Sequence, residues 1–268
     1  MLRKIVVTSG KGGVGKTTVV ANLGLQLAKS GSRVALVDCD FGLNNLDVVT
    51  GIDGKIVFDL IDVLNGRCRP KQALIESDLS SNLFVMPCTH SLSKSEITGQ
   101  SLKAMLESVE NLFDYIIFDC PAGIDMGFHR AVSCADEALV VITPNISSVR
   151  DADKVISILK TYKLTSVKGV VNRMRGDLVL SGESYSAEDI ENTLKLPIIG
   201  LIPECYELGD YLVDIVNSTP TKAFKLLANN VKKQEEKTFD YIKKYTGFWG
   251  SIRRELKKRL WKINCQRN

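Results

Sequence analysis

The sequence predicts an α/β protein in which a mostly parallel central sheet is covered by helices on both faces. Short β-branched runs alternate with stretches of helical periodicity, and the runs are almost continuously apolar, as in strands buried on both faces. A glycine-rich segment, residues 9–20 with the sequence SGKGGVGKTTVV, joins the first apolar run to the first helical stretch. A structural turn needs only one or two glycines, so this segment indicates close approach of a ligand to the backbone.

The elements follow one another in a regular order. The expected strands are Lys4–Thr8, Arg33–Asp38, Leu83–Met86, Tyr115–Asp119, Ala138–Thr143, Val167–Asn172 and Ile198–Ile202. Amphipathic helical stretches lie between them, among them Thr17–Lys29, Gln100–Asn111, Val149–Tyr162 and Ala187–Leu194. Ligands of such folds bind beyond the carboxyl ends of the strands, so the residues that follow each strand are the candidates for chemistry.

Composition and charge limit the possible classes. The seven cysteines of this 268-residue chain are scattered, without a CxxC pair or metal-ligand spacing, which favours a reducing compartment. Apolar runs stay shorter than the roughly 18 residues of a spanning helix, so we expect neither a membrane span nor a secretory signal before the first strand. Residues 243–268 carry nine Lys or Arg and one acid, whereas the rest of the chain has a net charge of −4. We expect one domain over residues 1–245 and a separate basic tail over 246–268.

The glycine-rich segment fits the phosphate-binding pattern G-x-x-x-x-G-K-[ST] and lies where that pattern requires, between a strand and a helix. Backbone N–H groups and the helix N-terminus can hold phosphate oxygens there, Lys16 can reach the β- and γ-phosphates, and the Thr17 hydroxyl can bind Mg²⁺. The fold class is therefore P-loop NTPase-like, with ATP and Mg²⁺ as expected ligands; the alternative is a glycine-rich turn. The expected nucleotide contacts are Gly10, Lys11, Gly12, Gly13, Val14, Gly15, Lys16, Thr17 and Thr18.

A second lysine, Lys11, stands early in the loop in the pattern K-G-G-x-G-K-T. This pattern resembles the deviant Walker A motif of the MinD/ParA family of ATPases. The resemblance implies a homodimer that holds two ATP molecules between its subunits, with Lys11 crossing to the partner's nucleotide and Lys16 holding the chain's own. A cation aimed at the γ-phosphoryl oxygens is consistent with phosphoryl-transfer chemistry. The alternative for Lys11 is a solvated loop lysine.

Two carboxylates follow the second strand in the sequence LVDCDFGLNNLD. One carboxylate can hold Mg²⁺ through water and another can orient an attacking water, although acids in a loop are often merely solvated. The resemblance makes this segment switch I, with Asp38 in the magnesium shell, Asp40 as the catalytic water-orienting residue, and Asn45 in the N-L-D continuation.

Another apolar strand ends in the sequence YIIFDCPAGID. Asp119 at its end corresponds to a Walker B carboxylate near the metal. Pro121 and Gly123 belong to a D-x-P-A-G turn that resembles switch II, in which the Gly123 N–H can contact the γ-phosphate. The metal-site candidates are therefore Thr17, Asp38 and Asp119, and the switch candidates are Asp38, Asp40, Asn45, Asp119, Pro121 and Gly123.

The nucleotide base is less directly indicated. The guanine-selecting N-K-x-D pattern is absent from the sequence, and residues 170–175 and 200–205 resemble the adenine-side segments of the family. Asn172 is the candidate base contact; the alternative is an asparagine that caps a turn. Cys205 stands where many relatives carry an acid, so we assign it no role.

The tail has the pattern of a basic amphipathic helix over residues 248–263. Its expected membrane-facing residues are Phe248, Trp249, Ile252, Leu256, Leu260, Trp261 and Ile263. An anionic bilayer suits such a helix, and two tails in one dimer would bind far more tightly than one. Docking as a core helix, nucleic-acid binding and a calmodulin-like partner are the alternatives; the acidic body leads us to expect no nucleic acid.

The resemblance also implies a biological role and partners. It implies a switch that positions the division site of a cell or plastid, works in the cytoplasm or plastid stroma at the inner face of a membrane, and meets a MinE-like activator and a MinC-like inhibitor. Residues 147–154 resemble a partner-docking helix, with Asp151 and Asp153 as candidate contacts.

Three other functions remain open at this point. A ParA-like DNA-partitioning ATPase would need basic residues spread over the body. An iron–sulfur reductase of the nitrogenase iron-protein type would need paired cysteines, and Cys120 stands in the wrong context for one. The third is a nucleotide-binding module without turnover. Hydrolysis that is unchanged after mutation of Lys11 or Asp40 would favour it.

Overall fold

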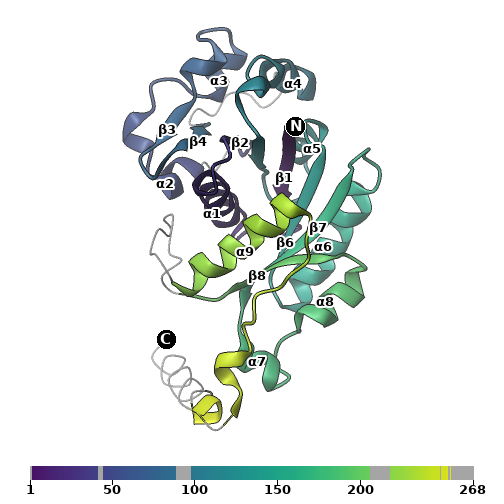
Figure 1. The fold of residues 1–268 in the computed structure, drawn as a ribbon. Helices are drawn as coiled ribbons and strands as arrows, with labels where there is room; N and C mark the ends of the chain where they lie inside the picture. Colours follow the sequence, from purple (N-terminus) through teal and green to yellow (C-terminus); the bar gives the residue numbers. More distant parts are fainter. Residues whose placement is uncertain are drawn as a thin grey trace, which may run out of the picture.

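The computed structural model describes residues 2–41, 45–88, 98–205, 218–247, 249–252 and 254. Within these ranges an eight-stranded sheet has the order β3-β4-β2-β5-β1-β6-β7-β8 (Figure 1). The strands are β1 (Arg3–Thr8), β2 (Val34–Asp38), β3 (Ile75–Ser77), β4 (Ser80–Met86), β5 (Tyr115–Asp119), β6 (Glu137–Ile142), β7 (Ser166–Met174) and β8 (Ile198–Pro203). All neighbouring strands in this sheet pair in parallel except β3, which pairs antiparallel with β4. The expected α/β class and all seven expected strands are confirmed, and the three-residue edge strand β3 is an addition.

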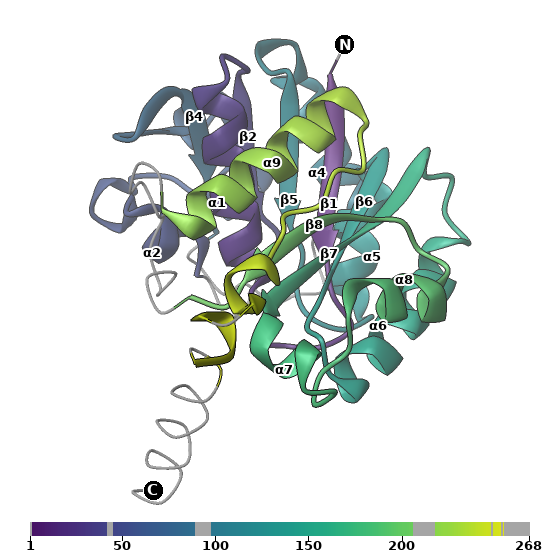
Figure 2. The same cartoon turned by 60° about the horizontal axis from the view of Figure 1, so that its bottom comes forward.

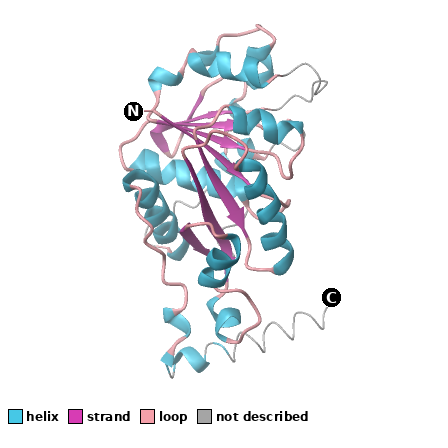
Figure 3. Ribbon diagram, turned by 90° about the vertical axis from the view of Figure 1, so that its right-hand side faces the viewer, coloured by secondary structure: helices cyan, strands magenta, loops and turns pink. Residues whose placement is uncertain are grey.

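Helices cover both faces of the sheet, as the side view in Figure 3 shows. The helices are α1 (Lys16–Lys29), α2 (Leu46–Thr50), α3 (Leu60–Leu64), α4 (Gly99–Glu107), α5 (Met126–Ser133), α6 (Ile146–Leu159), α7 (Gly176–Leu180), α8 (Ala187–Leu194) and α9 (Thr219–Lys233). Short 3₁₀ turns are η1 (Asp53–Lys55), η2 (Pro70–Gln72), η3 (Glu110–Leu112) and η4 (Lys243–Tyr245). The core layer on one face includes α1, α2 and α9, and the layer on the other face includes α3 to α6 and α8. Because successive side chains of a strand point to opposite faces, Ile5 and Val7 enter one layer and Val6 the other.

The parallel register brings the functional candidates to one edge of the sheet. Val7 of β1 and Asp38 of β2 are both register partners of Asp119 in β5, and Thr8 of β1 pairs with Val140 of β6. The carboxyl ends of four adjacent strands therefore meet at the point where the glycine-rich segment leaves β1. This arrangement sets the position of the candidate site.

After α9 the chain returns along the sheet to α7 as an extended segment (Figures 1 and 2). This segment ends in η4, and residues 249–252 are helical. Of the expected membrane-facing residues, Trp249 is 73% exposed and Ile252 is 38% exposed. The remaining ones, Phe248, Leu256, Leu260, Trp261 and Ile263, lie outside the described residues. Among the described helices, none is at once long enough and apolar enough to cross a membrane.

Candidate functional site

A cavity of about 600 Å³ lies at the carboxyl ends of β1, β2 and β5, and we call it the phosphate cavity. Its walls include Lys16, Thr17, Asp40, Asn45, Asp119 and Arg173. Gly12, Gly13, Gly15 and Thr18 of the expected nucleotide contacts also line it. Residues that are far apart in the sequence are therefore gathered at one place, and both switch segments contribute to it.

Glycine is needed at different positions of the loop for different physical reasons. Gly13 and Gly15 have φ values of 74° and 89°, in the left-handed region that favours glycine. A Cβ on Gly10 would lie 2.3 Å from the backbone carbon of Asp151, so this glycine lets α6 approach the loop. Gly10 thus couples the loop to a helix, whereas Gly13 and Gly15 shape the loop itself.

Asn172, the candidate base contact, braces the loop from β7. Its Nδ2 donates to the backbone oxygen of Val14 at 2.8 Å, and its side chain is buried. A Cβ on Gly15 would lie 2.4 Å from the same nitrogen, which is a further reason for glycine there. The structure therefore gives Asn172 a structural task, and contact with a base stays a prediction.

Arg173 is a site residue that the sequence reasoning missed. It is one of three described non-glycine residues with a positive φ, 58°. It lines the phosphate cavity and also a neighbouring cavity of about 440 Å³, the side cavity, which Lys11 and Val14 border as well. A left-handed arginine carries no sequence signal, because the conformation becomes visible only once β7 and the loop are placed.

Two carboxylates lie side by side beneath the cavity. Asp38 and Asp119 are register partners at the ends of β2 and β5, and they are 1% and 4% exposed. Asp38 Oδ1 accepts the backbone N–H of Asp40 at 2.9 Å, which turns the chain and directs Asp40 to the cavity wall. The D-x-D element is thus a single turn with one buried and one accessible acid.

Burial governs the acid–base behaviour of this pair. Burial raises the pKa of Asp119 to about 6, although the Thr17 hydroxyl and the Lys16 ammonium act in the opposite direction. The pKa of Asp38 is raised well above its usual value, first by burial and then by the charge of Asp119. Two neighbouring buried carboxylates repel each other when both are ionised, so the pair favours binding of a proton or a cation.

The donor set fits a magnesium ion. Asp119 Oδ1 is buried and has no hydrogen-bond partner among the described residues. The Thr17 hydroxyl interacts with the same carboxylate, and Mg²⁺ binds oxygen ligands of this kind. Thr17 and Asp119 would hold the ion directly or through water, with Asp38 behind them.

The expected switch II turn touches the phosphate loop from the other side. Gly123 has a φ of 90°, and its N–H donates to the backbone oxygen of Ser9 at 3.3 Å. That N–H would have to leave Ser9 before it could contact a γ-phosphate. Pro121 packs beside Gly127 at the start of α5, whose N-cap is Asp125. The turn therefore contacts the loop, and its role as a switch that senses the γ-phosphate stays a prediction.

Lys11 points away from the phosphate cavity and toward α6. Its Nζ lies 3.3 Å from Ser147 Oγ, at the exposed start of that helix. Asp151 of the same helix forms an ion pair with Lys154 at 3.2 Å, and Asp153 is exposed. The early lysine is thus available at the surface, next to the segment that resembles a partner-docking helix.

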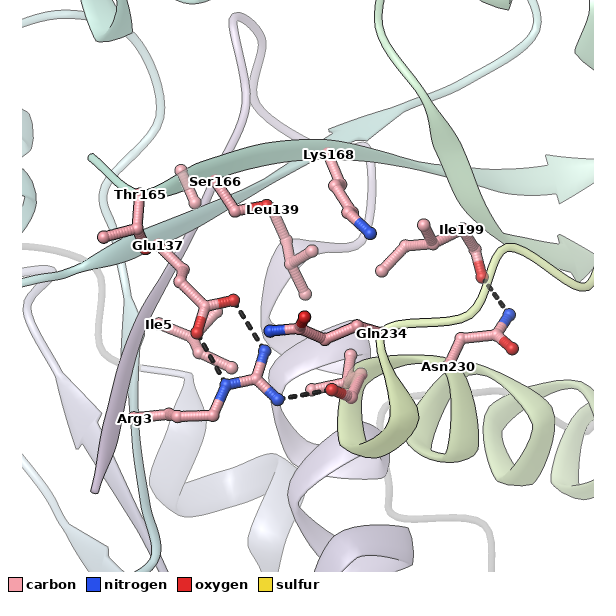
Figure 4. Close-up of a pocket in the computed structure, with 12 residues that line it drawn as sticks. Arg3, Ile5, Glu137, Leu139, Thr165, Ser166, Lys168, Ile199, Asn230 and Gln234 are labelled. Carbon is pink, nitrogen blue, oxygen red and sulfur yellow. Dashed lines mark hydrogen bonds and ion pairs between the residues drawn. The ribbon is translucent and has the colours of Figure 1, made fainter. Parts of the chain in front are cut away.

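A third cavity, of about 230 Å³, lies at the opposite, amino end of the sheet (Figure 4). There the charges are paired with one another: Arg3 donates to both oxygens of Glu137 at 2.6 Å and also to the backbone oxygen of Val231. Lys168 pairs with Glu236 at 3.5 Å. We call this place the amino-end cavity.

Comparison with known proteins decides the family. A family model described as an AAA domain matches residues 2–172. The septum site-determining protein MinD of Synechocystis sp. is 41% identical over 263 residues, which cover 96% of this chain and 99% of that protein. This chain belongs to the MinD family.

Solved structures of MinD proteins share the fold. MinD in the MinC:MinD cell division protein complex of Aquifex aeolicus is 38% identical with a TM-score of 0.82, and the match covers 89% of this chain and 99% of that one. MinD of Pyrococcus horikoshii, solved with Mg-ADP, is 30% identical with a TM-score of 0.78 and coverage of 87% and 97%. The family assignment and the P-loop NTPase fold expected from the sequence are therefore confirmed.

Proposed function

We propose that this chain is a Mg²⁺-dependent ATP hydrolase whose nucleotide state controls its attachment to a membrane. The observation that carries the proposal is the phosphate cavity, where Lys16 and Thr17 meet a buried carboxylate beside left-handed glycines, and one oxygen of that carboxylate has no hydrogen-bond partner among the described residues. The relative from Pyrococcus horikoshii that was solved with Mg-ADP supports the choice of ligand.

The residues divide the hydrolytic task among them. Backbone N–H groups of the loop and Lys16 hold the phosphates, and Thr17, Asp38 and Asp119 hold Mg²⁺, which neutralises charge on the phosphate oxygens when bound. Asp40 lies on the cavity wall, where a carboxylate can orient the attacking water. Because Asp40 is held by the turn that starts at Asp38, the metal site and the water site are built as one unit.

Lys11 supplies the link between hydrolysis and dimerisation. Its Nζ rests on Ser147 Oγ and lines the side cavity, so it does not compete with Lys16 for the chain's own phosphates. Two copies that meet at their phosphate loops would let each Lys11 reach the other's γ-phosphate, where a cation stabilises the transition state. Dimerisation then becomes a condition for turnover.

Membrane binding follows from valency. We propose two units: the ATPase domain, residues 1–245, and the amphipathic tail, residues 246–268, with Trp249 and Ile252 already exposed on it. One tail binds an anionic leaflet weakly, and two tails in an ATP-bridged pair gain through effective concentration. The protein would then lie on the inner face of a cell or plastid membrane with ATP and return to the cytoplasm or stroma after hydrolysis.

Partners would read the dimer. The Aquifex aeolicus relative was solved as a MinC:MinD complex, which supports a MinC-like partner for this chain. The exposed start of α6, where Ser147 contacts Lys11 and Asp153 is exposed, offers a surface for a MinE-like activator that senses the loop. In this role the switch positions division regulators at the membrane.

The test of this proposal compares two lysines on α1. Lys16→Ala should lower Mg-ATP affinity and hydrolysis by on the order of 100-fold, because it removes a charge from the phosphates. Lys29→Ala, at the far end of the same helix, is the matched control and should change neither. Measured turnover of [γ-³²P]ATP that is equal in wild type and Lys16→Ala would contradict the proposal.

A further inference from the structure

The returning segment after α9 is unusually well held for a stretch without regular structure. We call residues 235–245 the strap. At its start, Asn230 Nδ2 donates to the backbone oxygens of Ile199 and Lys237, which ties α9, β8 and the strap together (Figure 4 shows the bond to Ile199). The ion pair of Lys168 with Glu236 adds a contact to β7. The strap thus begins from a fixed point at the amino end of the sheet.

The middle of the strap is part of the core. Phe239 packs against the apolar layers on both faces of the sheet, so it covers the edge at β8. Tyr241 is only 6% exposed and belongs to one of these layers. Asp240 Oδ1 accepts the N–H groups of Ile242 and Lys243 and so fixes the turn into η4. A segment with these contacts is a structural element and not a loose linker.

The end of the strap is seated on a glycine of α7. A Cβ on Gly176 would lie 2.5 Å from the backbone oxygen of Tyr241, 3.2 Å from Cα of Ile242 and 2.9 Å from Tyr245 Cδ2. Gly176 does not have a left-handed φ, so close packing alone explains the glycine. Tyr245 is 4% exposed in this seat.

The tail helix is seated in turn on the strap. A Cβ on Gly250 would lie 2.2 Å from the carbonyl carbon of Tyr245 and 2.5 Å from its oxygen, and Gly250 also lacks a left-handed φ. Tyr245 is therefore held between two glycines, one on the folded body and one on the first turn of the tail. Contact with backbone atoms cannot be relieved by turning a side chain.

We propose that Gly176, Tyr245 and Gly250 form a rigid mount that fixes the direction in which the amphipathic tail leaves the body. This inference rests on the proposed membrane function. α7 follows the carboxyl end of β7, so the mount lies at the same end of the sheet as the phosphate loop (Figure 2). Two subunits that meet at their loops would bring their mounts together and present both tails to one leaflet.

Tether length gives the expected size of the effect. With the strap seated, only residues 246 and 247 separate Tyr245 from the tail helix expected at 248; with the end of the strap released, residues 240–247 become flexible. Effective concentration falls roughly as the −3/2 power of tether length. The gain in vesicle affinity that the second tail provides should therefore drop on the order of tenfold. Binding of a single tail does not depend on the tether.

The experiment measures sedimentation of the full chain with phosphatidylglycerol–phosphatidylcholine vesicles, with Mg²⁺ and either a non-hydrolysable ATP analogue or ADP. The readout is the ratio of the two apparent vesicle affinities, with nucleotide binding and thermal melting measured in parallel. The variants are Gly176→Ala and Gly250→Ala. Gly54→Ala is the matched control, because a Cβ at Gly54 meets no atom within 4 Å.

We expect both mount variants to lose about tenfold in the ratio while binding nucleotide normally, and the control to keep the wild-type ratio. Gly250→Ala gives the sharpest result, since alanine raises helix propensity and would strengthen tail binding if the mount had no role. It also carries the test alone if Gly176→Ala fails to fold. A wild-type ratio in Gly250→Ala would overturn the mount, whereas a wild-type protein that binds equally in both nucleotides would remove the proposed function itself.

Discussion

The two ends of the sheet carry cavities of opposite character. At the amino end, Arg3 and Glu137 form a bidentate ion pair (Figure 4), and Lys168 forms an ion pair with Glu236. At the carboxyl end, Asp119 keeps a buried oxygen without a partner among the described residues, and Asp38 lies directly beside it. Charged side chains line both cavities; at the carboxyl end two buried carboxylates lie beside each other, whereas at the amino end charges of opposite sign form ion pairs.

This difference shows how a ligand site can be recognised. A buried polar group costs free energy unless it is paired, so a fold that leaves one unpaired is stabilised by whatever binds there. In the amino-end cavity the charged groups are paired with one another and serve stability; the Asn230 Oδ1 atom, which is buried there without a partner among the described residues, is neutral and costs less than an unpaired charge. Variants at the carboxyl end should therefore change nucleotide binding or hydrolysis, and variants at the amino end should change stability alone.

Lys11→Ala should reduce ATP hydrolysis by about 10³-fold, because a cation in trans to the γ-phosphate has effects of that order. Affinity for Mg-ADP should stay within a few-fold, since Lys11 contacts Ser147 and not the phosphate cavity. Steady-state turnover and binding of a fluorescent ADP analogue measure the two quantities. Equal losses in both would show that Lys11 serves its own subunit's nucleotide.

Lowering the pH should act in opposite directions on the empty and the loaded site. Burial raises the pKa of Asp119 to about 6 from a usual 3.8, so the folded apoprotein prefers the protonated acid. This contribution to the free energy of unfolding is complete below pH 3.8 and is lost as the pH rises through 6. Mg²⁺ needs the carboxylate, so Mg-ADP affinity should fall about tenfold per pH unit below 6.

The matched variant is Asp119→Asn. At pH 7.5 the apo variant should unfold at a higher urea concentration than the wild type, and the gap should close as the pH falls below 6, because only the wild type gains from protonation. Mg-ADP affinity of the variant should be low at every pH. A variant that is less stable than wild type at pH 7.5 would mean that burial of the ionised Asp119 carboxylate does not destabilise the folded apoprotein.

Arg3→Ala should affect stability alone. It removes charged hydrogen bonds to Glu137 and to Val231, which are worth about 2 kcal/mol, and so should lower the melting temperature by roughly 5 °C. Mg-ADP affinity should remain within twofold of wild type, because the amino-end cavity and the phosphate cavity lie at opposite ends of the strands. Calorimetry and nucleotide titration check both parts; a tenfold loss of affinity would break the contrast between the two ends.

The sequence predicted the fold and most members of the site because their signals are local. Apolar runs that end in Asp38 or Asp119, and a loop with lysines at 11 and 16, are visible without any tertiary information. In a parallel sheet, strand ends meet at one edge, so the local signals also predicted which residues would be neighbours.

The rest depended on contacts between distant segments. Glycine is needed at position 10 because the backbone of Asp151 lies against it. Asn172 hydrogen-bonds to Val14, which is 158 residues away in the sequence. Arg173 lines the phosphate cavity because its backbone has a left-handed φ, and the strap is positioned by close packing against Gly176. Such packing relations leave no periodic or motif-like trace in one chain.

The most direct test of the account is vesicle sedimentation of the intact chain and of a chain ended after Tyr245, each with a non-hydrolysable ATP analogue and with ADP. Strong sedimentation is predicted only for the intact chain with the ATP analogue, because only that state holds two tails together. Sedimentation of the shortened chain, or equal sedimentation of the intact chain with both nucleotides, would contradict the conversion of nucleotide state into valency.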